Sequence, residues 1–205
     1  VEALVRWFIN ENVLAKSAVE VSVDGKPTGA FNVVSQEKFI AALILPEISF
    51  EQAYQLARQP STLLFNIDNF TVNANGIDIK LAKTPFFYYL WYAYLRVNDV
   101  QSGWLINPSS AHPDLQSAKS ILALMKEHNG HSKSINELET HGLRAKTLDQ
   151  NRNKIKESFV AQLGESLSEA YLFELLRDTR TGRFQYRLKL DSARIFLPKS
   201  INYNN

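Results

Sequence analysis

The stretch "TLDQNRNKIKESFVAQLG" (residues 147–164) has the pattern of one amphipathic helix. Thr147 can accept a backbone hydrogen bond as the N-cap, and Gly164 suits the left-handed position that follows a helix. Four apolar residues fall on one side at helical spacing, so we expect that side to be buried: Leu148, Ile155, Phe159 and Leu163. The opposite side is mostly polar and carries Lys146, Gln150, Asn153, Lys154, Glu157 and Ala161. It is either a solvated surface or a contact surface, and the neighbouring segments decide between the two.

The segments before and after this helix give it a recognisable setting. "SINELETHG" (134–142) predicts a short helix ended by Gly142, and "AYLFELLRDTRTGRFQYRLKL" (170–190) predicts two strands joined at "DTRTGR". A short helix, a turn with glycine and a second helix form a helix-turn-helix, and a following hairpin makes it winged. Arg180 and Arg183 are expected at the tip of that hairpin. This order favours a contact surface over a solvated one.

The upstream segments complete one domain. "TLLFNIDNFTVNANGIDIKL" (62–81) predicts strands around an Asn-Gly turn. In "TPFFYYLWYAYLRV" (84–97), Thr84 is the expected N-cap and Pro85 the first residue of a central helix that is aromatic on nearly every side. A further helix begins after Pro113, and its expected buried face consists of Leu115, Ala118, Ile121, Leu122 and Met125.

The first sixty residues carry no chemical motif. A short helix is expected over 1–16, a β-hairpin over 19–34, and apolar and helical segments up to Pro60. We therefore predict an α+β chain with an N-terminal docking segment (1–60), a winged helix-turn-helix domain (61–199) and a tail (200–205). Because the sequence starts at Val1, we expect it to be a trimmed or partial chain.

Composition narrows the class of protein. The 205 residues are 45% hydrophobic and 21% charged, as in globular proteins, and they include no cysteine, which excludes disulfides and favours the cytoplasm. The apolar run "FIAALILP" (39–46) is too short to cross a bilayer, so no membrane partner is expected. The net charge is only +2. Residues 144–189, however, hold ten basic and six acidic side chains, a modest basic surplus suited to a polyanion.

These observations predict duplex DNA as the partner. Amide and lysine side chains of the second helix would enter the major groove, and hairpin arginines would hold the flanking backbone or minor groove. The predicted contacts are Lys146, Gln150, Asn153, Lys154, Arg180 and Arg183. Arg152 falls between apolar neighbours on the helical wheel, and two roles stay open for it: reaching around to a phosphate, or pairing with an acidic residue of the wing.

Catalytic alternatives rest on weaker patterns. Asp68, Asp78 and Lys80 could form a metal-dependent nuclease site, but Asp78 and Lys80 also fit the polar side of an ordinary half-exposed strand. Without cysteine, only carboxylates could complete a zinc site around the histidines, which are His112, His128, His131 and His141. The chain contains no Gly-rich phosphate loop and no Gly-x-Ser-x-Gly motif. We expect no catalytic residue, no metal and no cofactor.

Two families are similar to this chain in pattern. Residues 64–190 resemble the winged-helix effector domain of response-regulator transcription factors through "ANGIDIKL", "TPFFYYLWYAYL", "FVAQLG" and "YRLKL". The expected helix over 113–128 departs from that family, and the chain contains no receiver domain. Residues 43–198 look more like the C-terminal portion of CRISPR-associated ancillary proteins, through "LPEISFEQAYQL", residues 65–95 and "YRLKLDSARIFLP". In that family a CARF domain, a sensor of cyclic oligoadenylate, precedes a winged helix.

The second resemblance implies a role and a missing part. It implies that the chain is the effector half of a CRISPR-linked antiviral defence or transcription-regulatory protein, without its CARF sensor. The function that this implies is a non-enzymatic DNA-binding module, which can form a homodimer. The alternative is a protein-interaction or dimerisation module that couples the sensor to a partner, because many winged helices do not contact DNA.

Overall fold

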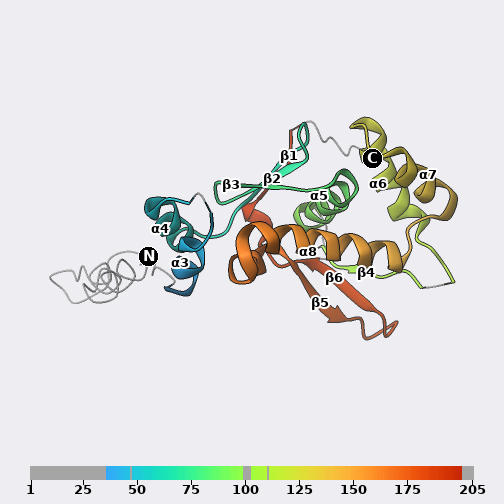
Figure 1. The fold of residues 1–205 in the computed structure, drawn as a ribbon. Coiled ribbons are helices and arrows are strands. Elements are labelled where there is room, and N and C mark those ends of the chain that lie inside the picture. The colour runs from blue at the N-terminus through green and yellow to red at the C-terminus, as the bar shows by residue number, and fades with distance from the viewer. Residues whose placement is uncertain (1–35, 47, 99–102, 110, 200–205) are drawn as a thin grey trace. The chain divides into compact units, whose positions relative to one another are not determined.

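The computed structural model describes residues 36–46, 48–98, 103–109 and 111–199 (Figure 1). These residues divide between two compact units, 36–60 with 163–167 and 61–162 with 168–199. The helix and hairpin predicted within residues 1–34 and the predicted tail 200–205 lie outside the described residues. Helices and two sheets together give an α+β protein, which confirms the predicted class.

The smaller unit contains the helices α3 (Gln36–Leu43) and α4 (Phe50–Arg58). Ser49 and Gln52 form a capping box, in which the backbone N–H of each residue donates to the side chain of the other, at 2.9 and 3.2 Å. The rings of Phe39 and Phe50 meet edge to face, with centroids 5.4 Å apart. The apolar segment before Pro46 thus begins as the helix α3.

A four-stranded sheet forms one side of the larger unit. The strands β1 (Leu63–Asn66), β2 (Thr71–Ala74) and β3 (Ile77–Lys80) are antiparallel neighbours, and β7 (Ile195–Phe196) pairs in parallel with β1. The strand order is β3-β2-β1-β7. Asn75 and Gly76 join β2 to β3 with φ angles of 49° and 88°, which confirms the predicted turn.

The central helix α5 (Lys83–Asn98) is the core of the larger unit. All residues from Pro85 to Ala93 are buried, as its aromatic composition predicts. The helix begins earlier than expected, because the N–H of Phe86 donates to the carbonyl of Ala82 at 3.0 Å. The prediction of Thr84 as N-cap is therefore wrong, and its hydroxyl instead hydrogen-bonds the hydroxyl of Ser134 at 2.8 Å.

Three helices follow α5: α6 (Leu115–Glu127), α7 (Ser132–His141) and α8 (Ala145–Ser168). On α6, three residues of the predicted face are buried: Ala118, Ile121 and Met125. Leu122 is half-buried, and Leu115 is 64% exposed, so its predicted burial is wrong. Leu115 opens the first turn directly after the N-cap Asp114, whose carboxylate accepts the N–H of Ser117 at 2.9 Å. Gly142 turns the chain between α7 and α8 with φ 66°, where a Cβ would lie 2.8 Å from Leu115 Cδ2. This turn requires glycine.

The helix α8 agrees with the opening prediction on its buried side but not at its start. Arg144 is the N-cap, and its carbonyl accepts the N–H of Leu148 at 3.1 Å, so Thr147 lies inside the first turn and is not the cap. The four predicted apolar residues are all buried, at 2% exposure or less. Gly164, with φ 73° and ψ 168°, interrupts the helix where its end was predicted, and a further turn follows.

A second, three-stranded sheet consists of β4 (Leu105–Ile106), β5 (Phe173–Arg177) and β6 (Phe184–Leu188) in the order β4-β6-β5. The strands β5 and β6 form the predicted hairpin, with Leu175 opposite Tyr186 and Arg177 opposite Phe184. In its turn the N–H of Asp178 donates to the carbonyl of Arg183 at 2.8 Å. The hairpin runs beside α8 (Figure 1).

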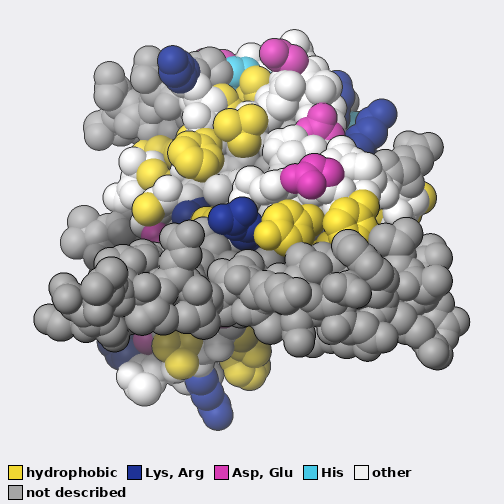
Figure 2. Space-filling model, turned by 90° about the vertical axis from the view of Figure 1, so that its left-hand side faces the viewer, with side chains coloured by type: hydrophobic (Ala, Val, Ile, Leu, Met, Phe, Trp, Pro, Cys, Tyr) yellow, Lys and Arg dark blue, Asp and Glu magenta, His cyan; other side chains and the backbone are white. Residues whose placement is uncertain are grey.

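The described part of the face in Figure 2 is mixed in chemical character. On the face in Figure 2, hydrophobic side chains lie among Lys, Arg, Asp and Glu side chains, in keeping with the small net charge. None of the described helices has the length and apolar content needed to cross a membrane.

Phe159 joins α8 to the core and provides a test of the packing. Its ring is fully buried and lies 5.4 Å from the ring of Tyr89 and 5.6 Å from that of Tyr171, centroid to centroid. Phe159→Ala is expected to lower the free energy of unfolding by ~3–5 kcal/mol, because it removes a buried ring and leaves a cavity. The exposed Glu157→Ala serves as control and should change it by less than ~0.5 kcal/mol. Equal urea midpoints for the two variants would contradict the described core.

Candidate nucleic-acid interface

The exposed side of α8 holds the four predicted helix contacts. Lys146, Gln150, Asn153 and Lys154 are all exposed. At about 100° per residue, they share an arc opposite the buried apolar side. None of these four side chains therefore packs in the core. Gln150, Asn153 and Lys154 border two different hollows, one on each edge of the arc.

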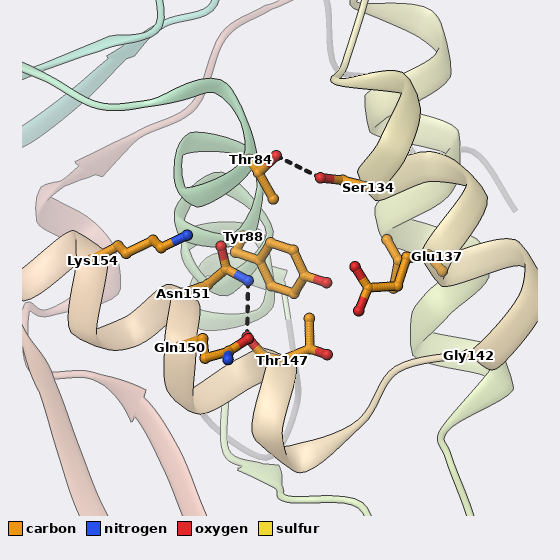
Figure 3. Close-up of a pocket in the computed structure, with 10 residues that line it drawn as sticks. Thr84, Tyr88, Ser134, Glu137, Gly142, Thr147, Gln150, Asn151 and Lys154 are labelled. Atoms are coloured by element: carbon orange, nitrogen blue, oxygen red, sulfur yellow. Dashed lines mark hydrogen bonds between the residues drawn. The ribbon is translucent and has the colours of Figure 1, made fainter.

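One edge of the arc borders a polar pocket between α5, α7 and α8 (Figure 3). Its volume is about 130 Å³, and Gln150 and Lys154 line it together with Glu137 of α7. The phenol of Tyr88 points between Glu137 and Thr147 (Figure 3). Burial, and then the charge of Glu137, raise the pKa of Tyr88 well above its usual value, so its hydroxyl stays protonated.

The other edge of the arc borders a groove between α8 and the β5–β6 hairpin. Its volume is about 370 Å³. The lining residues come from α8, the segment after it and the hairpin: Asp149, Arg152, Asn153, Lys156, Glu169, Leu172, Phe173, Leu175, Tyr186 and Lys189. Asn153 thus borders a different hollow from Gln150 and Lys154, and we call this hollow the hairpin groove.

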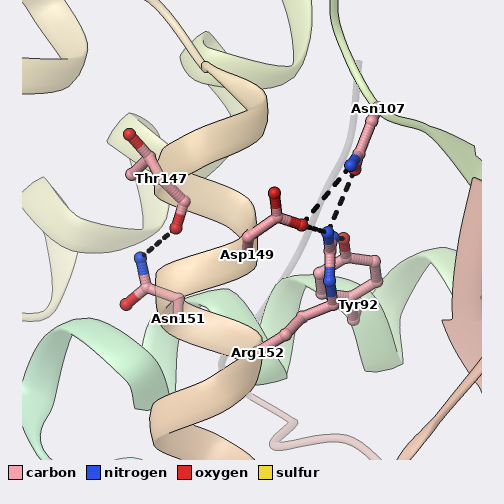
Figure 4. A network of polar contacts seen from close by, with 6 residues as sticks. All are labelled: Tyr92, Asn107, Thr147, Asp149, Asn151 and Arg152. Carbon is pink, nitrogen blue, oxygen red and sulfur yellow. Dashed lines mark hydrogen bonds and ion pairs between the residues drawn. The ribbon is translucent and has the colours of Figure 1, made fainter. Parts of the chain in front are cut away.

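Arg152 connects α8 to three other parts of the larger unit, and Figure 4 shows two of these contacts, to Tyr92 and Asn107. Its side chain is buried, at 5% exposure, and donates to the hydroxyl of Tyr92 at 2.5 Å and to Oδ1 of Asn107 at 3.2 Å. It also forms an ion pair with Asp149, one turn earlier on α8. The guanidinium carbon lies 3.6 Å from the ring centroid of Tyr186 in β6, a cation–π geometry.

Both roles left open for Arg152 by the sequence are wrong. Its acidic partner comes from α8 and not from the wing, and its buried guanidinium has hydrogen-bonded partners within the protein. The sequence did indicate that Arg152 is buried, because it lies beside Leu148 and Ile155 on the helical wheel. Burial raises the pKa of Tyr92 to about 12, even though the charge of Arg152 opposes that shift. The phenol is therefore neutral at ordinary pH and accepts the guanidinium N–H.

The two predicted hairpin arginines differ in their surroundings. Arg180 is exposed in the turn. Arg183 is half-buried and donates from Nη1 to the carbonyl of Asn107 at 3.0 Å. Since Asn107 also accepts from Arg152, Arg183 helps to fix the hairpin against the residues after β4. Of the two, Arg180 is the one whose charge faces solvent.

Two basic residues of this surface were missed by the sequence reasoning. Lys156 is exposed on α8 and lines the hairpin groove. A wider arc on the helical wheel would have included it. Lys189 lines the same groove because its N–H donates to the carbonyl of Leu172 at 3.0 Å, a pairing across 17 residues that no local pattern indicates.

The residues of the nuclease alternative have ordinary structural surroundings. Asp78 is exposed and accepts a hydrogen bond from the amide of Asn73 at 2.7 Å. The backbone of Lys80 is paired on the edge of the sheet with the side-chain amide of Gln162, at 3.0 and 3.3 Å. Within the described ranges, no three His, Asp or Glu side chains gather as metal ligands would. Of the histidines, His128 has its Nε2 buried, and the other three are exposed.

Comparison with protein-family models, curated proteins and solved structures finds no match for this chain.

Substitutions of Arg152 test whether its shape or only its charge matters. Arg152→Lys keeps the charge, but an ammonium cannot stack flat on Tyr186 while donating to Tyr92, Asn107 and Asp149. Arg152→Lys and Arg152→Met are both expected to lower the free energy of unfolding by about 1–3 kcal/mol, because buried polar groups lose their partner. The exposed Lys154→Met is the matched control. Full stability of Arg152→Lys in urea denaturation would refute this role.

Proposed function

We propose that the chain is a non-enzymatic, winged helix-turn-helix module that binds duplex DNA. The observation that supports this most is the succession of α7, the Gly142 turn, α8 and the β5–β6 hairpin, with a polar arc of α8 that the core does not use. A helix with amide and lysine side chains on its outer side has the donors and acceptors that base edges and phosphates require.

Each of the six predicted contact residues has a role in this proposal. Gln150 and Asn153 read base edges in the major groove, where amides pair with adenine. Lys146 and Lys154 neutralise phosphates beside them, and Arg180 holds the flanking backbone or minor groove. Arg183 belongs to the same surface and orients the hairpin through the carbonyl of Asn107.

The biological setting is a proposal by resemblance. The similarity to CRISPR-associated ancillary proteins favours the effector half of an antiviral defence or transcription-regulatory protein in the cytoplasm. In that setting a CARF sensor would control the module, and two copies would bind DNA as a homodimer. Two-fold symmetric dimers are the usual way in which helix-turn-helix proteins read paired half-sites.

One observation favours a second candidate, a protein-interaction or dimerisation module. Leu175 and Phe184 lie on one face of the hairpin, and each is more than 50% exposed. Large apolar side chains clustered on a surface are typical of protein interfaces. If this function is the correct one, the hairpin contacts a protein, and the chain has no salt-dependent affinity for DNA.

The salt dependence of binding separates the two candidates. We expect a random duplex to bind with log affinity falling linearly against log salt concentration. Replacing Lys146, Lys154 and Arg180 by alanine should flatten that slope by roughly 0.9 for each phosphate that the variant no longer neutralises. A control variant removes the same charge elsewhere, through alanine at the exposed residues Lys80, Lys119 and Lys199.

Fluorescence anisotropy at four salt concentrations measures these slopes. The control variant should keep a slope close to that of the wild type, because its lysines do not lie on α8 or the hairpin. Equal slopes for both triple variants would place the DNA elsewhere on the protein. No salt-dependent binding by the wild type would leave the interaction module as the better function.

A further inference from the structure

The hairpin groove has features that a perfect DNA duplex does not use. Its volume of about 370 Å³ lies in the range of small-ligand sites, roughly 300–1,000 Å³. It opens beside the polar arc of α8, so a nucleic acid held on that arc would pass over it.

The charges of the groove leave one lysine uncompensated. Arg152 pairs with Asp149, and Lys189 pairs with Glu169, so both carboxylates in the lining are neutralised within it. Among the described residues, Lys156 takes part in no ion pair. The groove therefore carries one net positive charge, located on the α8 side.

The hairpin side of the groove is apolar. Leu175 is 54% exposed and lies opposite Tyr186 in the pairing of β5 with β6, and Phe173 lines the groove beside them. Side chains alternate along a strand, so Phe184 lies on the same face, two residues before Tyr186, and is 51% exposed. An apolar track thus leads from the groove toward the turn.

We propose that the hairpin groove binds an unpaired nucleotide of the nucleic acid, an inference that rests on the proposed nucleic-acid binding. The phosphate would pair with Lys156, and the base would lie against Leu175 and Tyr186. A sugar-phosphate backbone is too polar to cover this apolar surface, whereas the face of a base covers it well. In a perfect duplex the base faces are stacked on one another, so an unpaired base is the one that can fit. The next base along the strand would reach Phe184.

Three labelled duplexes of equal length and sequence test this assignment: one perfect, one with a single bulged adenosine, and one with an abasic bulge. We expect the bulged duplex to bind ~10-fold more tightly than the perfect one, because the stacking of one base on a side chain strengthens binding by about that factor. The abasic bulge has the same flexible backbone without a base, and it should show none of that gain.

Two variants of the same strand provide a matched pair. Leu175→Asn should remove the preference for the bulged duplex and leave the affinity for the perfect duplex unchanged. Leu176→Asn is the control, since Leu176 is equally exposed, at 51%, but points to the opposite face of β5. Both positions are surface positions, and thermal unfolding verifies that both variants fold.

The outcomes separate this inference from the proposed function. Salt-dependent binding with equal affinity for all three duplexes overturns the nucleotide site and leaves the proposed function intact. No binding to any duplex overturns both. The same nucleotide chemistry could come from a free nucleotide, so binding of dAMP alone is measured as well. Binding of dAMP to the wild type more tightly than binding of the bulged duplex would assign the groove to a free nucleotide and overturn the strand assignment.

Discussion

The buried guanidinium of Arg152 is the interaction on which the arrangement of the larger unit depends. It holds α8 against α5 through Tyr92, against the residues after β4 through Asn107, and against the hairpin through the ring of Tyr186. A buried cation without partners would be strongly destabilising, so its partners must be in place together. With the inner side of α8 fixed in this way, the opposite arc remains exposed.

The exposed arc lies between two hollows of different chemistry. The pocket beside α7 is lined by hydroxyl, amide, carboxylate and ammonium groups, and the hairpin groove combines a lysine with apolar and aromatic residues. A duplex on the arc would contact both edges, and each edge would select a different feature. Under the proposed function, this division would give one helix separate means of positioning a backbone and of recognising a base.

Local patterns predicted β1–β3, α5–α8, the β5–β6 hairpin and the buried side of α8. The short strands β4 and β7 and the long-range partners required the structure. The Asn75-Gly76 turn and the burial of Phe159 follow from residue types at fixed spacing. The start of α8 was misplaced because the cap is the backbone of Arg144, whereas the sequence offered the hydroxyl of Thr147. Two partners of Arg152, Asn107 and Tyr92, are 45 and 60 residues away in sequence, and Lys189 joins the groove only through strand pairing. The wheel identified four exposed residues on α8 and missed Lys156, whereas the groove depends on chain segments that meet only in the fold.

The most direct measurement of the central claim is a map of amide chemical shifts on titration with a random duplex. For a chain of 23.3 kDa, ¹⁵N-labelled spectra resolve most backbone amides. We expect the largest shifts over residues 144–157 of α8 and over 177–183 of the hairpin turn, and small shifts in β1, β2 and β3. Shifts concentrated in the four-stranded sheet or in α3 and α4, with α8 unperturbed, would contradict this claim.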